Sequence, residues 1–347
     1  MNKAVLSSIF FVCLTVQTVS IFLITRYSRG VLKEKFSIPS SILLNEIIKL
    51  FVSLIGIFVT HKEKYFSHLK TLIMCSLVSS VPALIYFFQN ILSQVALSNI
   101  HPGLYSILSQ LKILSAALLS VIILGKKLTT TQWRALLALV VCVTIVESAN
   151  RAASNSSNEK TEMGNYFLGI ITAIIANSAS GFSGVYMEKI LKNKVSSGPK
   201  LNLWERNFQL SLYSILFAAI NVFVVDFKST FTLGPFHDFS WTAFLMVLDY
   251  SVGGILVALV MTYADVIVKG FAVSVAIVLT TLLSHFLFGS PINLEFALGA
   301  VGVLIAIANY NDETASYTFQ SKIKDVIEKE KSENAEKVDT ENDKKEK

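Results

Sequence analysis

Residues 4–25 read AVLSSIFFVCLTVQTVSIFLIT and contain no charged side chain. About 20 apolar residues cross the hydrocarbon layer of a bilayer as an α-helix, so this stretch is long enough to span a membrane. It is longer than the apolar core of a signal peptide, and no small-x-small cleavage site ends it before Arg26. We therefore expect it to be the first membrane span.

Similar stretches recur along the chain and predict an all-α membrane protein. Lipid offers the backbone no hydrogen-bond partner, so each stretch must be helical. Composition agrees, because 53% of the 347 residues are hydrophobic and only 16% are charged, which is too apolar for a soluble domain of this length. The ten predicted spans are 4–25, 38–60, 71–97, 102–124, 132–149, 165–188, 203–225, 240–262, 266–288 and 292–309.

The spans fall into two halves of five. Aligning Gly125, after the fourth span, with Gly289, after the ninth, superposes the halves and places Tyr105 opposite Lys269. Because five is odd, the second half is inverted, an arrangement in which substrate binds near the midplane between the repeats. We expect a ten-helix transporter domain at 1–310, with repeats at about 1–150 and 160–310, and a disordered, charged cytosolic tail at 311–347.

Charge placement predicts the orientation. Loops 61–70, 125–134 and 189–200 carry more Lys and Arg than the loops between them, which favours a cytosolic location for these loops and for both termini. Asn155 begins an Asn-Ser-Ser glycosylation sequon in a loop assigned to the lumen. Lys344 and Lys345 form a dilysine ending, which indicates retrieval to the endoplasmic reticulum or early Golgi.

Charged residues within spans are candidates for a binding site, because each costs roughly 2.5–3.5 kcal/mol to insert. Glu46 and Lys49 lie three residues apart, so an ion pair between them lowers the cost of inserting both charges. Their spacing therefore fits a structural or gating role as well as a role in binding. Lys112 lies midway along the fourth span with no neutralising residue on its own helix, which favours an anionic ligand or an acid from another span. Lys269 lies near the start of the ninth span. It is as compatible with a lysine whose side chain extends to the membrane interface as with a binding-site residue.

Neutral polar pairs also lie within spans. Asn90 follows Gln89, and Asn207 precedes Gln209 by two residues; such groups suit hydrogen bonds to a base, a ribose or another helix.

Two further sets of residues have simple structural interpretations. Gly253 and Gly254 are expected to let helices pack closely. Glu188 and Glu205, at the ends of their spans, are expected to be anchors at the membrane interface.

Several classes of function find no support in the sequence. Cys13, Cys75 and Cys142 form no Cys-x-x-Cys or Cys/His cluster, so neither a disulfide framework nor a metal site is predicted. The net charge of +6 comes from residues that flank spans, so nucleic acid is not expected as a partner. No paired carboxylates or activated nucleophile indicate an enzyme, and no cofactor is expected.

Ordered motifs in both halves resemble the Golgi and endoplasmic reticulum nucleotide-sugar transporters. The resemblance extends from the first span to Tyr310 and is closest to the branch of the UDP-galactose, UDP-N-acetylglucosamine and CMP-sialic acid carriers. The motifs are Val81-Pro82-Ala83-Leu84-Ile85-Tyr86, Gln89-Asn90, Gln110-Leu111-Lys112-Ile113, Ser180-Gly181-Phe182-Ser183-Gly184, Trp204-Glu205-Arg206-Asn207-Phe208-Gln209, Tyr263-Ala264-Asp265 and Lys269-Gly270-Phe271.

The resemblance implies the drug/metabolite transporter fold and the exchange of a cytosolic nucleotide sugar for a lumenal nucleoside monophosphate. UDP-galactose or UDP-N-acetylglucosamine exchanged for UMP is the leading cargo, and CMP-sialic acid exchanged for CMP is the alternative. By the same resemblance, Lys112 and Lys269 face the phosphates. The groups near the nucleotide are then Tyr105, Asn90, Ser180, Gly181 and Asn207.

Two positions depart from the family pattern. Thr262 stands where relatives usually have a lysine, and Ser211 stands where the sialic acid carrier has a tyrosine. These departures and the charged tail leave a second hypothesis open, a non-transporting scaffold or regulator of glycosylation. A homodimer, or a complex with a glycosyltransferase, also stays open.

Overall fold

The computed structural model describes residues 3–62, 65–100, 102–153, 165–192, 201–225, 232–234, 236–289 and 292–312. Within these ranges every regular element is helical, and ten helices are long and apolar enough to cross a membrane, which confirms the predicted fold class. The sequon at Asn155, the dilysine pair Lys344 and Lys345, and the tail from 313 onward lie outside the described residues.

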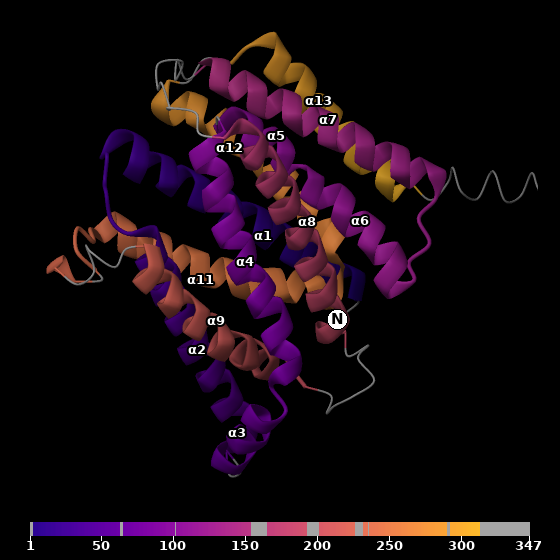
Figure 1. Cartoon of the computed structure of the whole chain (residues 1–347). Helices are drawn as coiled ribbons and strands as arrows, with labels where there is room; N and C mark the ends of the chain where they lie inside the picture. The colour runs from indigo at the N-terminus through magenta and orange to yellow at the C-terminus, as the bar shows by residue number, and fades with distance from the viewer. Residues whose placement is uncertain are drawn as a thin grey trace, which may run out of the picture.

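The helices follow one another without a strand in the described part of the chain (Figure 1). The first half contains α1 (Lys3–Arg26), the π-helical turn η1 (Tyr27–Val31), α2 (Ile38–His61), α3 (Tyr65–Met74), α4 (Leu77–Asn99), α5 (Pro102–Ser109), α6 (Leu111–Leu124) and α7 (Thr130–Ala153). The second half contains α8 (Tyr166–Leu191), α9 (Leu203–Val225), α11 (Trp241–Tyr263), α12 (Val266–Phe288) and α13 (Leu294–Asn311).

Side-chain caps fix where several of these helices begin. The first backbone N–H groups of a helix have no partner within it, so an oxygen just before the helix stabilises its start by about 1 kcal/mol. Ser37 accepts from Ser40 N–H at 3.1 Å before α2. Asp265 accepts from Val268 N–H at 2.9 Å before α12, and Asn293 accepts from Phe296 N–H at 2.9 Å before α13.

Two of the predicted spans are interrupted. The third was predicted to begin at 71, but the chain turns at Cys75 and Ser76, where the Ser76 hydroxyl donates to the Ile73 carbonyl at 2.6 Å. The fourth is divided at Gln110, whose N–H donates to Ile107 O at 3.2 Å and whose carbonyl accepts from Ile113 N–H at 3.0 Å. These bonds between residues three apart tighten the helix directly before Lys112.

Helix contacts occur in pairs that match when the two halves are exchanged. In this exchange α1, α2, α4, α6 and α7 correspond to α8, α9, α11, α12 and α13. Contacts of α1 with α11 and α12 match those of α8 with α4 and α6, and contacts of α2 with α11 match those of α9 with α4. The pairs α2 with α9 and α7 with α13 map onto themselves, and α7 and α13 lie side by side in Figure 1. This pattern is that of two inverted repeats packed around one axis.

The glycines used to align the halves also have equivalent conformations. Gly125 ends α6 with φ of 67°, and Gly289 ends α12 with φ of 66°. Only glycine adopts this left-handed backbone without strain, so each glycine ends its helix at the corresponding place in its repeat.

Large apolar side chains point outward on the spanning helices. Phe51, Ile55 and Phe58 on α2 are each more than half exposed. Because lipid tails are as apolar as these side chains, close helix packing relies on small residues instead. Gly299 on α13 illustrates this, since a Cβ added there would lie 2.8 Å from Val146 Cγ2 on α7.

The ends of the helices define two faces of the bundle. The α3 face comprises α3, residues 125–129, the end of α8, the start of α9 and residues 264–265; Figure 1 shows α3 beyond the ends of α2 and α9. The η1 face comprises η1, residues 32–37, the end of α4 and the starts of α8, α11 and α13. The alternating direction of the spans places these two sets at opposite sides of the membrane.

Glu34 joins the two halves on the η1 face. The Thr242 hydroxyl of α11 lies 2.6 Å from both carboxylate oxygens of Glu34, and the Ser28 hydroxyl donates to Oε2 at 2.6 Å. Partial burial raises the pKa of the Glu34 carboxyl, but hydrogen bonds from Ser240, Ser28 and Thr242 and the charge of Arg29 outweigh it and leave this pKa below its ordinary value.

The Glu34 contact predicts a pH-dependent stability. A carboxyl whose pKa is lowered by folding stabilises the fold above its unfolded pKa, and this contribution is lost as the pH falls through the lowered value. Glu34→Gln should therefore reduce the melting temperature equally at pH 7 and pH 6, with the difference disappearing in strong acid. Melting of the purified protein measures this effect, and Lys35→Gln on the same loop should leave the curve unchanged. A wild-type advantage that grows as the pH falls would contradict the assignment.

Candidate functional site

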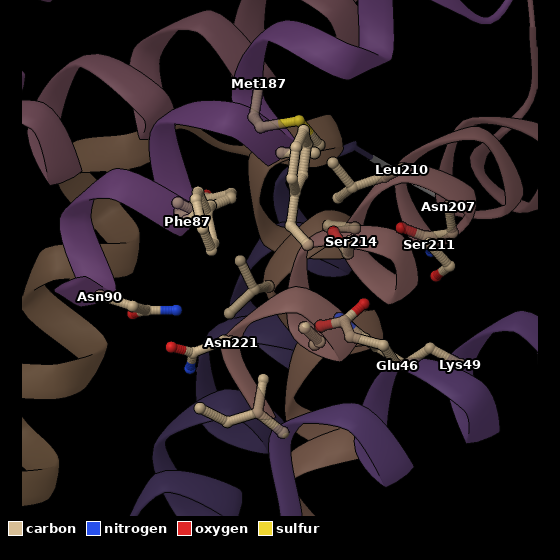
Figure 2. Close-up of a pocket in the computed structure, with 18 of the residues that line it drawn as sticks. Glu46, Lys49, Phe87, Asn90, Met187, Asn207, Leu210, Ser211, Ser214 and Asn221 are labelled. Atoms are coloured by element: carbon tan, nitrogen blue, oxygen red, sulfur yellow. The ribbon is translucent and has the colours of Figure 1, made fainter. Parts of the chain in front are cut away.

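A cavity of about 280 Å³ lies between helices of both halves. Its polar lining includes Glu46 and Lys49 on α2, Asn90 on α4, and Asn207, Ser211, Ser214 and Asn221 on α9. Tyr86, Phe87 and Met187 contribute apolar surface. Figure 2 shows Asn90 and Asn221 directed toward one part of this cavity, with Glu46 and Lys49 on another side. A largely apolar cavity with a few fixed polar groups is typical of a small-molecule site.

Three buried polar atoms of this first cavity have no hydrogen-bond partner among the described residues. They are Oε2 of Glu46, Nδ2 of Asn207 and Oδ1 of Asn221. A buried polar atom without a partner costs about 1–3 kcal/mol, so native proteins rarely retain one without a reason. A polar ligand in the cavity would provide an acceptor for Asn207 and a donor for Asn221.

Glu46 and Lys49 form the ion pair that their spacing predicted. Lys49 Nζ lies 2.6 Å from Glu46 Oε1. Gly254 of α11 makes room for this lysine, because a Cβ there would lie 2.8 Å from Lys49 Cδ. Gly253 instead faces α1, where a Cβ would lie 2.5 Å from Gln17 Nε2. Gly254 therefore lines the cavity, whereas Gly253 serves helix packing.

A second cavity of about 150 Å³ contains both candidate lysines. Lys112 on α6 and Lys269 on α12 line it together with Ser180, Gly181 and Gly184 on α8. The two ammonium groups repel each other, and Glu147 on α7 attracts Lys112. In the described part of the chain neither lysine has a carboxylate within 4.0 Å. Two such cations in a membrane interior favour an anionic ligand between them.

Apolar side chains separate the two cavities. Met187, Ala258 and Met261 line the first cavity, and they pack in one core cluster with Ile113, Val266 and Ile267, which line the second. A ligand that contacts both the asparagines and the lysines therefore requires these side chains to move. Methionine adapts to such changes because its side chain is unbranched and flexible.

Two of the residues predicted to contact the substrate lie in neither cavity. Tyr105 packs against the cluster of Ala96, Ile100 and Ala173. Gln209 is fully buried between α3, α4 and α9, where Nε2 donates to Leu72 O at 2.9 Å and Oε1 accepts from the Ser79 hydroxyl at 3.1 Å. Gln209 therefore connects helices in this conformation.

The two departures from the family pattern occupy different places. Ser211 lines the first cavity and leaves space there. The Thr262 hydroxyl donates to the Ala258 carbonyl of its own helix at 2.7 Å and lines neither cavity.

Glu188 forms an ion-pair network on the α3 face. Lys126 Nζ lies 2.9 Å from Glu188 Oε1 and 3.1 Å from Asp265 Oδ2, and Lys192 Nζ donates to Glu188 Oε1 at 2.7 Å. The Val266 N–H donates to Glu188 Oε2 at 2.9 Å, and Lys192 also donates to the Ala264 carbonyl. This network joins the loop after α6, in the first half, to α8 and the start of α12 in the second.

The prediction that Glu188 and Glu205 are interface anchors is wrong, because both side chains are buried. Glu205 forms a capping box at the start of α9: its N–H donates to Asn202 Oδ1 at 2.9 Å, and its Oε2 accepts from Asn202 N–H at 2.6 Å. The Asn-x-x-Glu spacing was a signal for this role that the sequence analysis missed.

The sequence analysis also overlooked two acids within spans. Glu147 on α7 accepts from Gln110 Nε2 at 3.3 Å, and Asp249 on α11 lies beside α1, where Gln17 Nε2 donates to its carbonyl at 3.0 Å. The criterion applied to Lys112, a charge inside an apolar stretch, would have found both.

Comparison with known proteins agrees with this architecture. The sequence profile described as "Nucleotide-sugar transporter" matches residues 2–311. The chain is 37% identical over 316 residues to the UDP-galactose/UDP-N-acetylglucosamine transporter of Caenorhabditis elegans, covering 89% of this chain and 83% of that one. It is 35% identical to the UDP-galactose translocator of Homo sapiens, covering 86% and 75%.

The chain belongs to the nucleotide-sugar transporter family. The resemblance seen in the ordered motifs is thereby confirmed, and the protein is a transporter rather than an enzyme. A further relative, the UDP-N-acetylglucosamine transporter of Rattus norvegicus, is 34% identical over 86% of this chain and 92% of its own. One crystal structure superposes with a TM-score of 0.63 over 88% of this transporter and 97% of that chain; at 13% identity it supports the fold alone.

The Glu188 network of this transporter predicts a large loss of stability on neutralisation. Glu188→Gln would leave Lys126 and Lys192 near a site that has lost its charge, and breaking a buried ion pair costs about 3–5 kcal/mol. We expect a marked fall in melting temperature in detergent. Glu295→Gln is the matched control, because Glu295 is exposed in the first turn of α13 and its neutralisation should cost no more than about 1 kcal/mol. Equal melting of both variants would show that the network contributes nothing to the stability of the α3 face.

Proposed function

We propose that this transporter exchanges a UDP-sugar, either UDP-galactose or UDP-N-acetylglucosamine, for UMP, and so imports the sugar nucleotide into the Golgi or endoplasmic reticulum lumen. Relatives that are 34–37% identical are named as transporters of these two cargoes. The observation that carries the proposal is the meeting of Lys112 and Lys269, from equivalent helices of the two halves, at one intramembrane cavity.

The two cavities suit the two parts of a nucleotide. Lysine binds phosphate as a compact point charge, and its attraction is strong where the dielectric constant is low. We assign the phosphates to Lys112 and Lys269, beside Ser180 and Gly181. We assign the nucleoside and sugar to the first cavity, where the amides of Asn90, Asn207 and Asn221 supply donors and acceptors.

The remaining predicted residues take supporting roles in this proposal. Glu46 and Lys49 border the first cavity and can gate it by exchanging their ion pair for a ligand contact. Tyr105 and Gln209 would contact the nucleotide only in another conformation of the alternating-access cycle, because they lie in neither cavity here.

The α3 face is proposed to be cytosolic. Loops 61–70, 125–134 and 189–200 carry the excess of Lys and Arg and lie at the α3 face where they are described. Both termini would then be cytosolic. The transporter domain is proposed to end near residue 310, with its repeats at about 1–150 and 160–310, a division that the matched helix contacts support.

The lysine assignment predicts the loss of nucleotide binding. Lys112→Ala and Lys269→Ala should each abolish UMP binding, since each removes a cation that no neighbouring residue replaces, while the protein stays monodisperse. Equilibrium binding of labelled UMP to purified protein measures this effect. Lys127→Ala, at an exposed position in the loop after α6, is the control. Wild-type affinity in either cavity variant would contradict the phosphate assignment.

Counterflow into proteoliposomes tests the exchange itself. Vesicles preloaded with UMP, CMP, GMP or AMP are supplied with a panel of labelled nucleotide sugars. Uptake of a UDP-sugar driven by internal UMP, and lost in Lys269→Ala, is the expected result. Exchange of CMP-sialic acid for CMP would correct the cargo, and folded protein that exchanges no pair would favour a non-transporting scaffold.

A further inference from the structure

Two histidines and a glutamate meet on the α3 face, away from both cavities. His61 ends α2, His68 lies on α3 and Glu205 lies in the first turn of α9. Nε2 of His61 is 2.9 Å from Glu205 Oε1, and Nε2 of His68 is 2.7 Å from the same oxygen. The three atoms that can bind a metal lie within 4.8 Å of one another.

From this geometry we infer that His61, His68 and Glu205 form a binding site for Zn²⁺. Two imidazole nitrogens and one carboxylate oxygen are a ligand set that zinc accepts, and a fourth position stays open for water. Nothing in the exchange mechanism uses these residues, since none of them lines either cavity.

The distances to the Glu205 oxygen require only a small adjustment. Tetrahedral zinc with bonds of about 2.0–2.2 Å places its ligand atoms about 3.4 Å apart. The two histidine nitrogens now lie 2.9 and 2.7 Å from the Glu205 oxygen, so the groups need to separate by roughly half an ångström. In the metal-free protein each Nε2–H donates to the carboxylate. On zinc binding each ring keeps one proton, moved to Nδ1, and Nε2 becomes the metal ligand.

The surrounding residues hold the three ligands in place. Glu205 Oε2 is fixed by Asn202 N–H at 2.6 Å, which leaves Oε1 directed at the histidines. The imidazole rings stack with centroids 4.0 Å apart and an angle of 26° between their planes, so one ring must rotate before both Nε2 lone pairs point at one ion. Ile57, Leu72 and Phe208 form an apolar cluster among the same three helices, packed against Trp204. Such support from outside the ligand set is a regular feature of metal sites.

Charge and exposure are consistent with metal entry. Glu205 is 5% exposed at its side chain, whereas His61 and His68 are 33% and 25% exposed, so the histidine side of the cluster is open. Arg206 lies next to Glu205 and interacts with it electrostatically, which opposes a second cation. However, the Arg206 guanidinium points toward α4, where it donates to Gln209 Oε1 at 3.3 Å.

Zinc at this site would hold α2 and α3 against α9. The helices α2 and α3 belong to the first half and α9 to the second, and α9 carries Asn207 only two residues after Glu205. If α2 and α9 separate during alternating access, bound zinc slows exchange. This consequence rests on the proposed exchange, whereas the site itself does not.

Zinc titration of the purified full chain tests the site. Competition with a zinc-chelating dye measures affinity for wild type, His61→Gln and His68→Gln; glutamine keeps an N–H donor for Glu205 and so preserves the metal-free network. His237→Gln, on the η1 face, is the matched control. Saturable binding by wild type and the control, weakened by about tenfold or more in both cluster variants, is expected. Affinity unaffected by the cluster variants, or no saturable binding by wild type, would overturn the inference.

A second measurement separates the site from the exchange. Zinc should raise the melting temperature of wild type and of His237→Gln but not of His68→Gln, because a ligand stabilises the state that binds it. In proteoliposomes, zinc on the α3 face should slow counterflow of wild type and spare His68→Gln. Inhibition that persists in His68→Gln would refute the clamp. If no nucleotide is exchanged at all, the titration and melting data still decide whether the site exists.

Discussion

The low dielectric constant of the membrane interior is the constraint on which this structure depends. It requires every spanning backbone segment to be helical and every intramembrane charge to have a compensating group. Glu46 and Lys49 meet the second requirement with each other, and Glu188 meets it with two lysines and a backbone N–H. Lys112 and Lys269 meet it only in part, and the unpartnered amide atoms of Asn207 and Asn221 lie at the neighbouring cavity. These four polar side chains therefore lie where the two inverted halves meet.

The pairing of the halves explains how such a site can move. Contacts between α1 and α11 match those between α8 and α4, so each half packs against the other through equivalent surfaces. In alternating access, one such repeat moves against the other around the binding site. The α3 face is held by the Glu188 network and the η1 face by Glu34, and each connection crosses from one half to the other. Methionine side chains between the cavities provide a boundary that can rearrange without breaking polar contacts.

The sequence predicted the ten spans because span length and the exclusion of charge are local properties. The motifs also identified the two lysines, which the structure brings together at one cavity. The sequence could not predict the breaks at Ser76 and Gln110, which depend on a few local hydrogen bonds between residues three apart. Nor could it predict the burial of Glu188, since its partner Lys126 lies 62 residues earlier in the chain. Gln209 has an amide side chain of the kind that binds ligands. Its hydrogen bonds go instead to α3 and α4, and these depend on tertiary packing.

The central claim is that a nucleotide occupies the cavity between the halves, and cysteine protection tests it most directly. In a background where Cys13, Cys75 and Cys142 are replaced, Ser214→Cys places a thiol in the first cavity, and Leu216→Cys places one on the lipid-facing side of the same helix. Modification by a water-soluble thiol reagent is measured with and without UMP. The account predicts that UMP slows modification at position 214 and leaves position 216 unaffected. Modification at 214 that is unchanged by saturating nucleotide, in protein that binds UMP, would contradict the account.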